Sequence, residues 1–150
     1  MVTEVRRGDY LISSDPRRID LDVVHRFLAR SYWAAGIPRA TVERSIAGSL
    51  SFGVYHAATQ VGFARVITDR ATFAYLADVF VLEEERGQGL GEWLMETILA
   101  HPDLQGLRRF SLVTRDAQGL YRKFGFHEVA HPERHMEIVR PDVYRRSGSA

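Results

Sequence analysis

Apolar residues recur along this chain with two periods, one typical of helices and the other typical of strands. Spacings of three and four residues run through residues 20–30, from Pro38 to Ile46 and through residues 90–101, and each stretch predicts a helix with one buried face. Pro38 fits the first turn of its helix, where no backbone N–H is needed. A shorter helix is expected over residues 116–124.

Runs rich in β-branched and aromatic residues predict seven strands. They cover residues 10–13, 50–56, 61–68, 72–82, 110–113, 126–129 and 135–139. Residues 57–60 join the second and third strands as a hairpin, and the longest strand, 72–82, is expected at the centre. The order of elements predicts an α+β, or mixed α/β, fold with one mostly antiparallel twisted sheet of about seven strands, flanked by about four helices.

The length of 150 residues suits one domain with a substantial core. We therefore expect a single domain over residues 1–150, with a basic and flexible tail at about 141–150. No run approaches the ~18 apolar residues of a membrane helix, and a net charge of +1 with interleaved acids and bases argues against nucleic acid as a partner. Because the charged N-terminus lacks the apolar core of a signal peptide and cysteine is absent, we expect a cytoplasmic protein without disulfides or a catalytic thiol.

A glycine-rich stretch, residues 86–91, separates the longest predicted strand from the next helix. The first N–H groups of a helix lack internal partners, and glycines let a phosphate approach the backbone, so this turn predicts an anion site. The spacing excludes G-x-G-x-x-G, because the third glycine would fall at Glu92 or Leu94. The absence of Gly-Lys-Ser or Gly-Lys-Thr excludes a Walker loop, and the two failed spacings weigh against a nucleotide-binding protein of either class.

The remaining pattern, Arg-x-x-Gly-x-Gly, resembles the acyl-CoA pyrophosphate loop of the GCN5-related N-acetyltransferases, the GNAT superfamily. About thirty residues downstream, residues 120–126 resemble the family signature Leu-Tyr-x-Lys-x-Gly-Phe, and Ala117 matches as well. Thr114 stands where the family often has asparagine, and Glu83 stands where it often has proline. The resemblance covers residues 73–129.

This resemblance implies an acetyl-CoA-dependent enzyme that moves an acetyl group to a primary amine by direct attack in a ternary complex. It also implies that two parallel strands, 72–82 and 110–113, splay apart around the thioester end of the cofactor. Family members are often dimers, so a homodimer is an expectation. The residues expected to contact acetyl-CoA are Val79, Phe80, Val81, Arg86, Gly87, Gln88, Gly89, Leu90, Gly91, Thr114, Ala117 and Lys123.

Tyr121 is the predicted general acid. A phenol has a reference pKa of about 10, so it holds a proton at neutral pH. The resemblance implies that this tyrosine points at the cofactor sulfur. The alternative is a core tyrosine on a buried helix face.

Asp78 stands inside an apolar strand, where a lone carboxylate is costly to bury unless it is paired or functional. It could act as a base, with a pKa raised by burial, or it could hold a cationic amine. The alternative is a structural aspartate paired with an arginine such as Arg65. Tyr75 or a water chain could also accept the proton of the amine.

Two aromatic residues, Tyr32 and Trp33, lie in the connection between the first two helices. They could cage an amine, with Asp78 supplying charge, or they could close the core, and both interpretations remain open. Together with Arg65 and Tyr75 they form the predicted acceptor site. We expect the amine of a small molecule rather than a peptide such as a histone tail, because the chain is minimal.

His131 and His135 have a spacing that occurs in metal sites. Pro132 argues against one helix presenting both, and no third ligand is in view, so no metal site is expected. Two classes of function remain open: an N-acetyltransferase, and a non-catalytic acyl-CoA-binding or regulatory module on the same fold.

Overall fold

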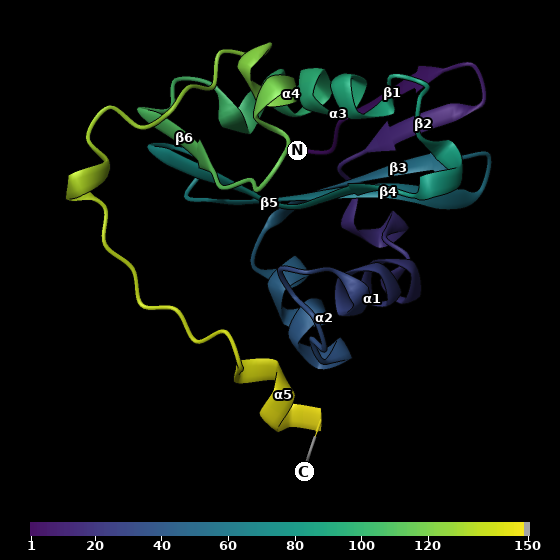
Figure 1. Cartoon of the computed structure of the whole chain (residues 1–150). Helices are drawn as coiled ribbons and strands as arrows, with labels where there is room; N and C mark the ends of the chain where they lie inside the picture. The colour runs from purple at the N-terminus through teal and green to yellow at the C-terminus, as the bar shows by residue number, and fades with distance from the viewer. Residues whose placement is uncertain (149–150) are drawn as a thin grey trace.

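A computed structural model describes residues 1–148. The strands form one sheet in the order β1-β2-β3-β4-β5-β6, and all neighbours are antiparallel except β5 and β6, which are parallel (Figure 1). The strands of the described chain are β1 (Glu4–Arg7), β2 (Tyr10–Ser13), β3 (Leu50–His56), β4 (Thr59–Thr68), β5 (Phe73–Val81) and β6 (Arg109–Leu112). Its α-helices are α1 (Leu21–Arg30), α2 (Arg39–Ala47), α3 (Leu90–Leu99), α4 (Gln118–Arg122) and α5 (Val143–Gly148).

Helices cover both faces of the sheet (Figure 1). On the face of α3 and α4, Phe52 of β3 and Leu94 of α3 belong to one buried cluster. On the face of α1 and α2, Phe63 and Phe80 belong to a second cluster. Successive side chains of a strand point to opposite faces, so Ala64, the neighbour of Phe63, lies in the first cluster and one strand supplies both layers.

β5 and β6 pair over only the first part of β5, and we call the region beyond the end of this pairing the gap. Their pairing ends at Leu76 opposite Leu112, although β5 continues to Val81. Within this continuation Asp78 has a φ of +56°, and the register between β4 and β5 shifts nearby. An extra residue bends a strand, so the bulge turns the end of β5 away from β6. This bulge and the early end of the β5–β6 pairing are the features that the expected splay of two parallel strands requires.

Two of the predicted strands do not form. Residues 126–129 and 135–139 have no strand partner in the described chain, so five of the seven predicted strands form, and the additional strand β1 brings the sheet to six. These segments have the sequence of strands, but a strand also needs a neighbouring backbone for its hydrogen bonds. In the opposite sense, β1 pairs with β2 although its sequence, Glu-Val-Arg-Arg, has no apolar alternation.

The C-terminal tail is mostly helical. α5 covers Val143–Gly148, and residues 149–150 lie outside the described part, so the expectation of a flexible tail at about 141–150 stays a prediction. Tyr144 of α5 lies against the α1–α2 connection, 3.8 Å from the position that a Cβ would take at Gly36. Neither α5 nor any other helix of the described residues is long and apolar enough to cross a membrane.

Candidate cofactor and acceptor site

The loop between β5 and α3 leaves its backbone open. A short 3₁₀ turn, Glu83–Glu85, follows β5, and Gly87 and Gly89 then adopt left-handed φ values of +85° and +76°. A side chain would be strained in this conformation, because its Cβ crowds the backbone. No heavy atom other than those of the adjacent residues lies within 4 Å of the position that a Cβ would take at either glycine. A ligand can therefore approach the backbone at the start of α3.

Glu85 fixes this loop to the sheet. Its carboxylate accepts a hydrogen bond from Tyr10 Oη at 2.5 Å and lies 2.9 Å from His56 Nδ1. The bond from Tyr10 is the main reason that the pKa of Glu85 is lowered. Gln88 donates to the same carboxylate and accepts from Tyr10. The Gln88 side chain is thus turned toward β2, and its backbone is the part left for a ligand.

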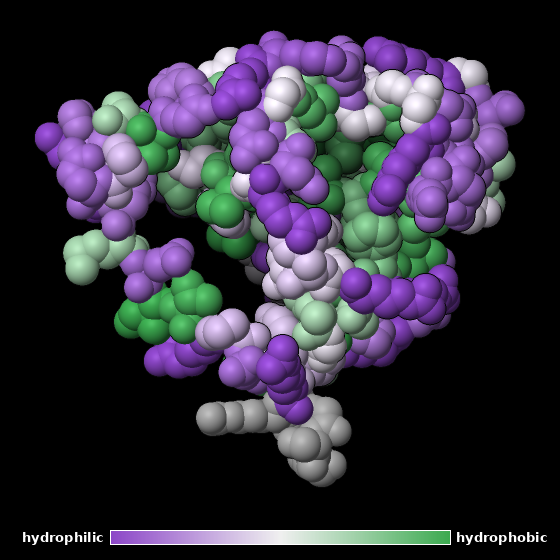
Figure 2. Space-filling model, in the orientation of Figure 1, coloured by the Kyte–Doolittle hydropathy of each residue, from purple (hydrophilic) through white to green (hydrophobic). Residues whose placement is uncertain are grey.

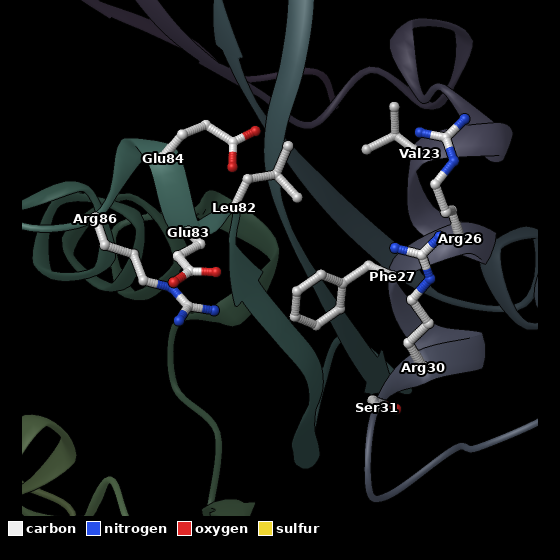
Figure 3. Close-up of a pocket in the computed structure, with 9 residues that line it drawn as sticks. All are labelled: Val23, Arg26, Phe27, Arg30, Ser31, Leu82, Glu83, Glu84 and Arg86. Atoms are coloured by element: carbon white, nitrogen blue, oxygen red, sulfur yellow. The ribbon is translucent and has the colours of Figure 1, made fainter.

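Two hollows adjoin at Arg86. The smaller, of about 180 Å³, is formed by the loop and includes Gly87, Gly89 and Gly91 in its lining. The larger, of about 280 Å³, lies between α1 and the loop, and the Phe27 ring points into it from α1 (Figure 3). Three guanidinium groups and two carboxylates surround the larger hollow, which suits a ligand with several charged groups. Its lining residues are Val23, Arg26, Phe27, Arg30, Ser31, Leu82, Glu83, Glu84 and Arg86.

Hydrogen bonds within the protein already use some of the polar groups on both sides of the gap. Arg86 Nε donates to the Val81 carbonyl at 3.0 Å, so one acceptor at the end of β5 is already used. Across the gap, Thr114 Oγ1 accepts from the Ala117 backbone N–H at 3.1 Å at the start of α4. Thr114 therefore organises the β6–α4 loop in this structure.

α3 and α4 lie close together next to the glycine loop. Leu90 is buried, and a Cβ at Gly91 would lie 4.0 Å from Leu120 of α4. Lys123 Nζ, at the end of α4, forms an ion pair with Glu92 of α3 at 2.7 Å. The charge of Lys123 is thus engaged with α3.

Tyr121 is buried on α4, with 8% of its surface exposed. Its ring meets Phe126 edge to face at 6.0 Å between centroids, and Phe126 packs in turn against Phe110 of β6. Burial raises the pKa of Tyr121, and the neighbouring Tyr32 raises it further. The phenol therefore keeps its proton at neutral pH, and the fold brings Tyr32 close to it.

Asp78 is held by donors from two other parts of the chain. Arg65 Nε of β4 donates to one carboxylate oxygen at 2.9 Å, and Trp33 Nε1 donates to the other at 2.8 Å. The side chains of Asp78 and Arg65 are 10% and 16% exposed. Because both oxygens accept hydrogen bonds, the carboxylate ties β5 to β4 and to the α1–α2 connection. These contacts match the alternative in which Asp78 is a structural aspartate paired with Arg65.

We expect Asp78→Ala to lower the free energy of unfolding by about 3 kcal/mol, because it leaves the largely buried Arg65 guanidinium without its counter-ion. The matched control is Asp103→Ala, which breaks the more exposed Arg70–Asp103 pair and should cost less than about 1 kcal/mol. Urea denaturation of the wild type and both variants measures the two losses. Equal, small losses would show that the Asp78 contacts contribute little to stability.

The α1–α2 connection carries exposed aromatic side chains beside the gap. Tyr32 and Trp33 are 55% and 42% exposed, and their rings meet edge to face at 5.1 Å. Arg115, from the β6–α4 loop, places its guanidinium 3.8 Å from the centre of the Tyr32 ring. This contact joins the two sides of the gap. The sequence does not indicate Arg115 as a site residue, because its partner lies far away in the chain.

Tyr75 lies on β5 in the same region. It is half-buried, and burial followed by the charge of Asp78 raises its pKa. Among the residues that the structure describes, no three histidine, aspartate or glutamate side chains gather in a way that could hold a metal ion.

Comparison with known proteins identifies the family. A family model described as an acetyltransferase (GNAT) domain matches residues 48–128, which is more than half of the chain. The chain belongs to the GNAT family of acetyltransferases. The matched part contains both walls of the gap, the glycine loop and Tyr121.

Individual relatives agree with this GNAT assignment. A protein of Gibberella zeae, named as a proposed acetyltransferase, is 34% identical, with 78% of each chain covered. The crystal structure of a protein from Xanthomonas campestris pv. campestris, assigned to the GNAT family, is 51% identical and has a TM-score of 0.88, covering 90% of this chain and 96% of that one. A structure from Clostridium acetobutylicum, solved with acetyl-CoA, has a TM-score of 0.63 at 13% identity, covering 93% and 96%, and shows the shared fold alone.

The GNAT motifs do not indicate the α1 side of the larger hollow. Arg26 and Arg30 lie one turn apart on α1, with Phe27 between them. In the sequence this spacing predicts a helix and gives no sign of a ligand. Only the packing of α1 beside the glycine loop turns these residues into the wall of a hollow.

Proposed function

We propose that this GNAT protein is an acetyl-CoA-dependent N-acetyltransferase whose acceptor is a primary amine of a small molecule. One observation carries the proposal. The buried, protonated Tyr121 of α4 is influenced by the exposed Tyr32 of the α1–α2 connection, and β5 beyond its pairing with β6 leads into the open glycine loop. A proton donor, an anion cradle and an aromatic acceptor surface thus belong to one region.

Acetyl-CoA suits the groups that this region offers. The Cβ-free backbone at Gly87 and Gly89, with the first N–H groups of α3, matches a pyrophosphate. The Arg86 nitrogens that do not bond Val81 can add charge-assisted hydrogen bonds. The β5 backbone beyond Leu76, which β6 leaves unpaired, suits the amide groups of an extended arm. The same-fold protein of Clostridium acetobutylicum was solved with acetyl-CoA.

Acetyl-CoA supplies an activated acetyl group when bound, and the protein's own residues supply positions and protons. We assign Tyr121 Oη as the proton donor for the departing sulfur, because burial keeps the phenol protonated. We assign Asp78 to positioning, because its two oxygens already hold Arg65 and Trp33. The proton of the acceptor amine then passes to solvent on the exposed side of Trp33.

The acceptor surface consists of Tyr32 and Trp33, whose ring faces attract a cationic or planar amine. Arg115 covers one face of Tyr32, so an acceptor that stacks there must displace this guanidinium or use the other face. Tyr75 and the Arg65–Asp78 pair lie behind this surface and belong to the proposed acceptor site.

The proposal is tested by CoA release from acetyl-CoA with a panel of amines: polyamines, amino acids, aminoglycosides, aryl amines and lysine peptides. We expect release that depends on a small-molecule amine and exceeds the hydrolysis seen without amine. Calorimetry with acetyl-CoA runs beside it. Binding without release for any amine would favour the non-catalytic acyl-CoA-binding module, and absence of binding would contradict both functions.

A further inference from the structure

The larger hollow combines an apolar surface with charged side chains. It has a volume of about 280 Å³, and Val23, Phe27 and Leu82 supply apolar lining. In Figure 2, hydrophobic residues are visible between the sheet and the region of α1, and hydrophilic residues project outward from that region. Sites for small molecules commonly join an apolar surface to a few charged groups that fix the ligand's orientation. The hollow therefore suits a small ligand with a charged end.

The charged side chains around this hollow do not neutralise one another. Arg26 and Arg30 line it from α1, and Glu83 and Glu84 line it from the 3₁₀ turn after β5 (Figure 3). Within residues 1–148, none of these four side chains forms an ion pair. Both signs of charge are therefore left for a ligand.

Arg26 lacks the partner that its own helix could supply. Asp22 lies four residues before it, a spacing at which an acid and a base attract each other on a helix. Asp22 instead bonds Arg39 of α2. Arg26 and Arg30 then lie one turn apart without a carboxylate, and like charges at this spacing repel each other. An anion bound between the two guanidinium groups would offset this repulsion.

The hollow leads to the proposed acceptor surface. The Phe27 ring points into the hollow, and it also meets the Trp33 ring with 6.2 Å between centroids (Figure 3). Ser31 lines the hollow and directly precedes Tyr32 in the chain. One ligand can therefore occupy the hollow and still reach the aromatic side chains of the α1–α2 connection.

We propose that Arg26 and Arg30 bind an anionic group of the acceptor, a carboxylate or a phosphate, while the acceptor's amine lies at the Trp33 side of the gap. This inference rests on the proposed function and names its substrate class, a small amine that also carries an anionic group. Four residues of helix place the two arginine Cα atoms about 6 Å apart. Two forked guanidinium groups at this spacing suit one carboxylate or phosphate, whose oxygens accept several charge-assisted hydrogen bonds.

The acidic side chains of the hollow favour the acceptor over the cofactor as the source of this anion. Glu83 and Glu84 repel a phosphate end that carries negative charge alone. The hollow proposed for the pyrophosphate shares only Arg86 with this one. A diamino carboxylic acid presents both signs of charge. Its carboxylate meets the arginines, one ammonium group meets the glutamates, and the second amine takes the acetyl group.

Matched pairs of amines test the substrate class. Lysine is compared with cadaverine, ornithine with putrescine, and phosphoethanolamine with ethanolamine, because the members of each pair differ only by the anionic group. We expect the wild type to favour the anionic member of at least one pair by about 100-fold in kcat/KM, the scale of one or two hydrogen bonds to a charged group. The double variant Arg26→Gln, Arg30→Gln should lose most of this preference, through a rise in KM for the anionic member.

Arg44→Gln is the matched control. Arg44 is an exposed arginine of α2 that lines neither hollow and has no ion-pair partner within residues 1–148. This variant should keep the wild-type preference. Equal kcat/KM within every pair, or a preference that the double variant retains, would overturn the inference and leave the N-acetyltransferase standing.

Calorimetry with acetyl-CoA identifies the cofactor as the alternative source of the anion. If the double variant keeps the acceptor preference but binds acetyl-CoA about 10-fold or more weakly, the arginines serve the cofactor and the inference is overturned. Absence of CoA release with every amine, while acetyl-CoA still binds, would contradict the proposed function itself, and this inference would fall with it.

Discussion

Replacing Tyr121 with phenylalanine should lower kcat for acetyl transfer by about 100-fold or more, because a positioned general acid contributes on this scale. The variant loses only the Oη proton donor and keeps the ring that packs against Phe126. The dissociation constant for acetyl-CoA should therefore stay close to that of the wild type. Steady-state CoA release and calorimetry measure the two quantities.

Tyr55→Phe is the matched control. Tyr55 is also buried, at 6% exposure, and its Oη has no hydrogen-bond partner among the described residues. Removing an unpaired buried hydroxyl leaves stability unchanged or raises it slightly, so kcat should not change. Wild-type kcat in Tyr121→Phe would assign Tyr121 to packing.

The pH profile adds an independent readout of the same role. Since burial raises the pKa of Tyr121 above the ordinary value of 10.0, the acid stays protonated through the neutral and mildly alkaline range. We expect kcat of the wild type to hold up to roughly pH 10 and to fall above it, as the phenol loses its proton. The Tyr121→Phe variant should lack this alkaline fall. If kcat falls in the same way in both proteins at alkaline pH, the fall does not arise from the loss of the Tyr121 proton.

Gly89→Val should weaken acetyl-CoA binding by about 100-fold, equivalent to roughly 2.7 kcal/mol. Gly89 has a φ of +76°, which strains a β-branched residue, and it lines the hollow of about 180 Å³ proposed for the pyrophosphate. A valine side chain would project from the backbone that a phosphate must approach. Calorimetry or fluorescence titration with acetyl-CoA measures the effect.

Gly106→Val separates strain from blocked binding. Gly106 has a similar φ of +72°, no heavy atom lies within 4 Å of its Cβ position, and it stands outside both hollows. Both variants should lose a similar stability, about 1–2 kcal/mol for a left-handed residue, but only Gly89→Val should lose affinity. Equal affinity in the two variants would contradict the proposed pyrophosphate cradle.

Much of the fold follows from local patterns. The helices over 21–30 and 90–99 and the strands of the central hairpin form where apolar residues predict them, because each helix buries one face and the two hairpin strands are buried on both faces. The start of α1 is also determined locally, because the Asp20 carboxylate accepts hydrogen bonds from the backbone N–H groups of Asp22 and Val23 and caps the helix. The glycine loop is equally local, because left-handed turns at Gly87 and Gly89 need glycine wherever they occur.

The strand predictions fail where strand formation depends on a neighbouring strand rather than on the local sequence. β1 lacks the apolar alternation of a strand but becomes one beside β2, and residues 135–139 have the pattern of a strand but find no neighbour within the described chain. The alternation of side chains reports burial on one face, whereas strand formation requires hydrogen bonds to another backbone.

By itself, the sequence determined the helices α1 to α4, the central strands and the glycine loop, because these depend on residue type and spacing within short windows. Only the tertiary structure decided what Asp78 and Tyr32 contact. It brought Trp33 and Arg65 to the two oxygens of Asp78, and Arg115 to the ring of Tyr32. Such contacts join residues distant in the chain, and they form only when the bulge of β5 and the packing of the α1–α2 connection place them together.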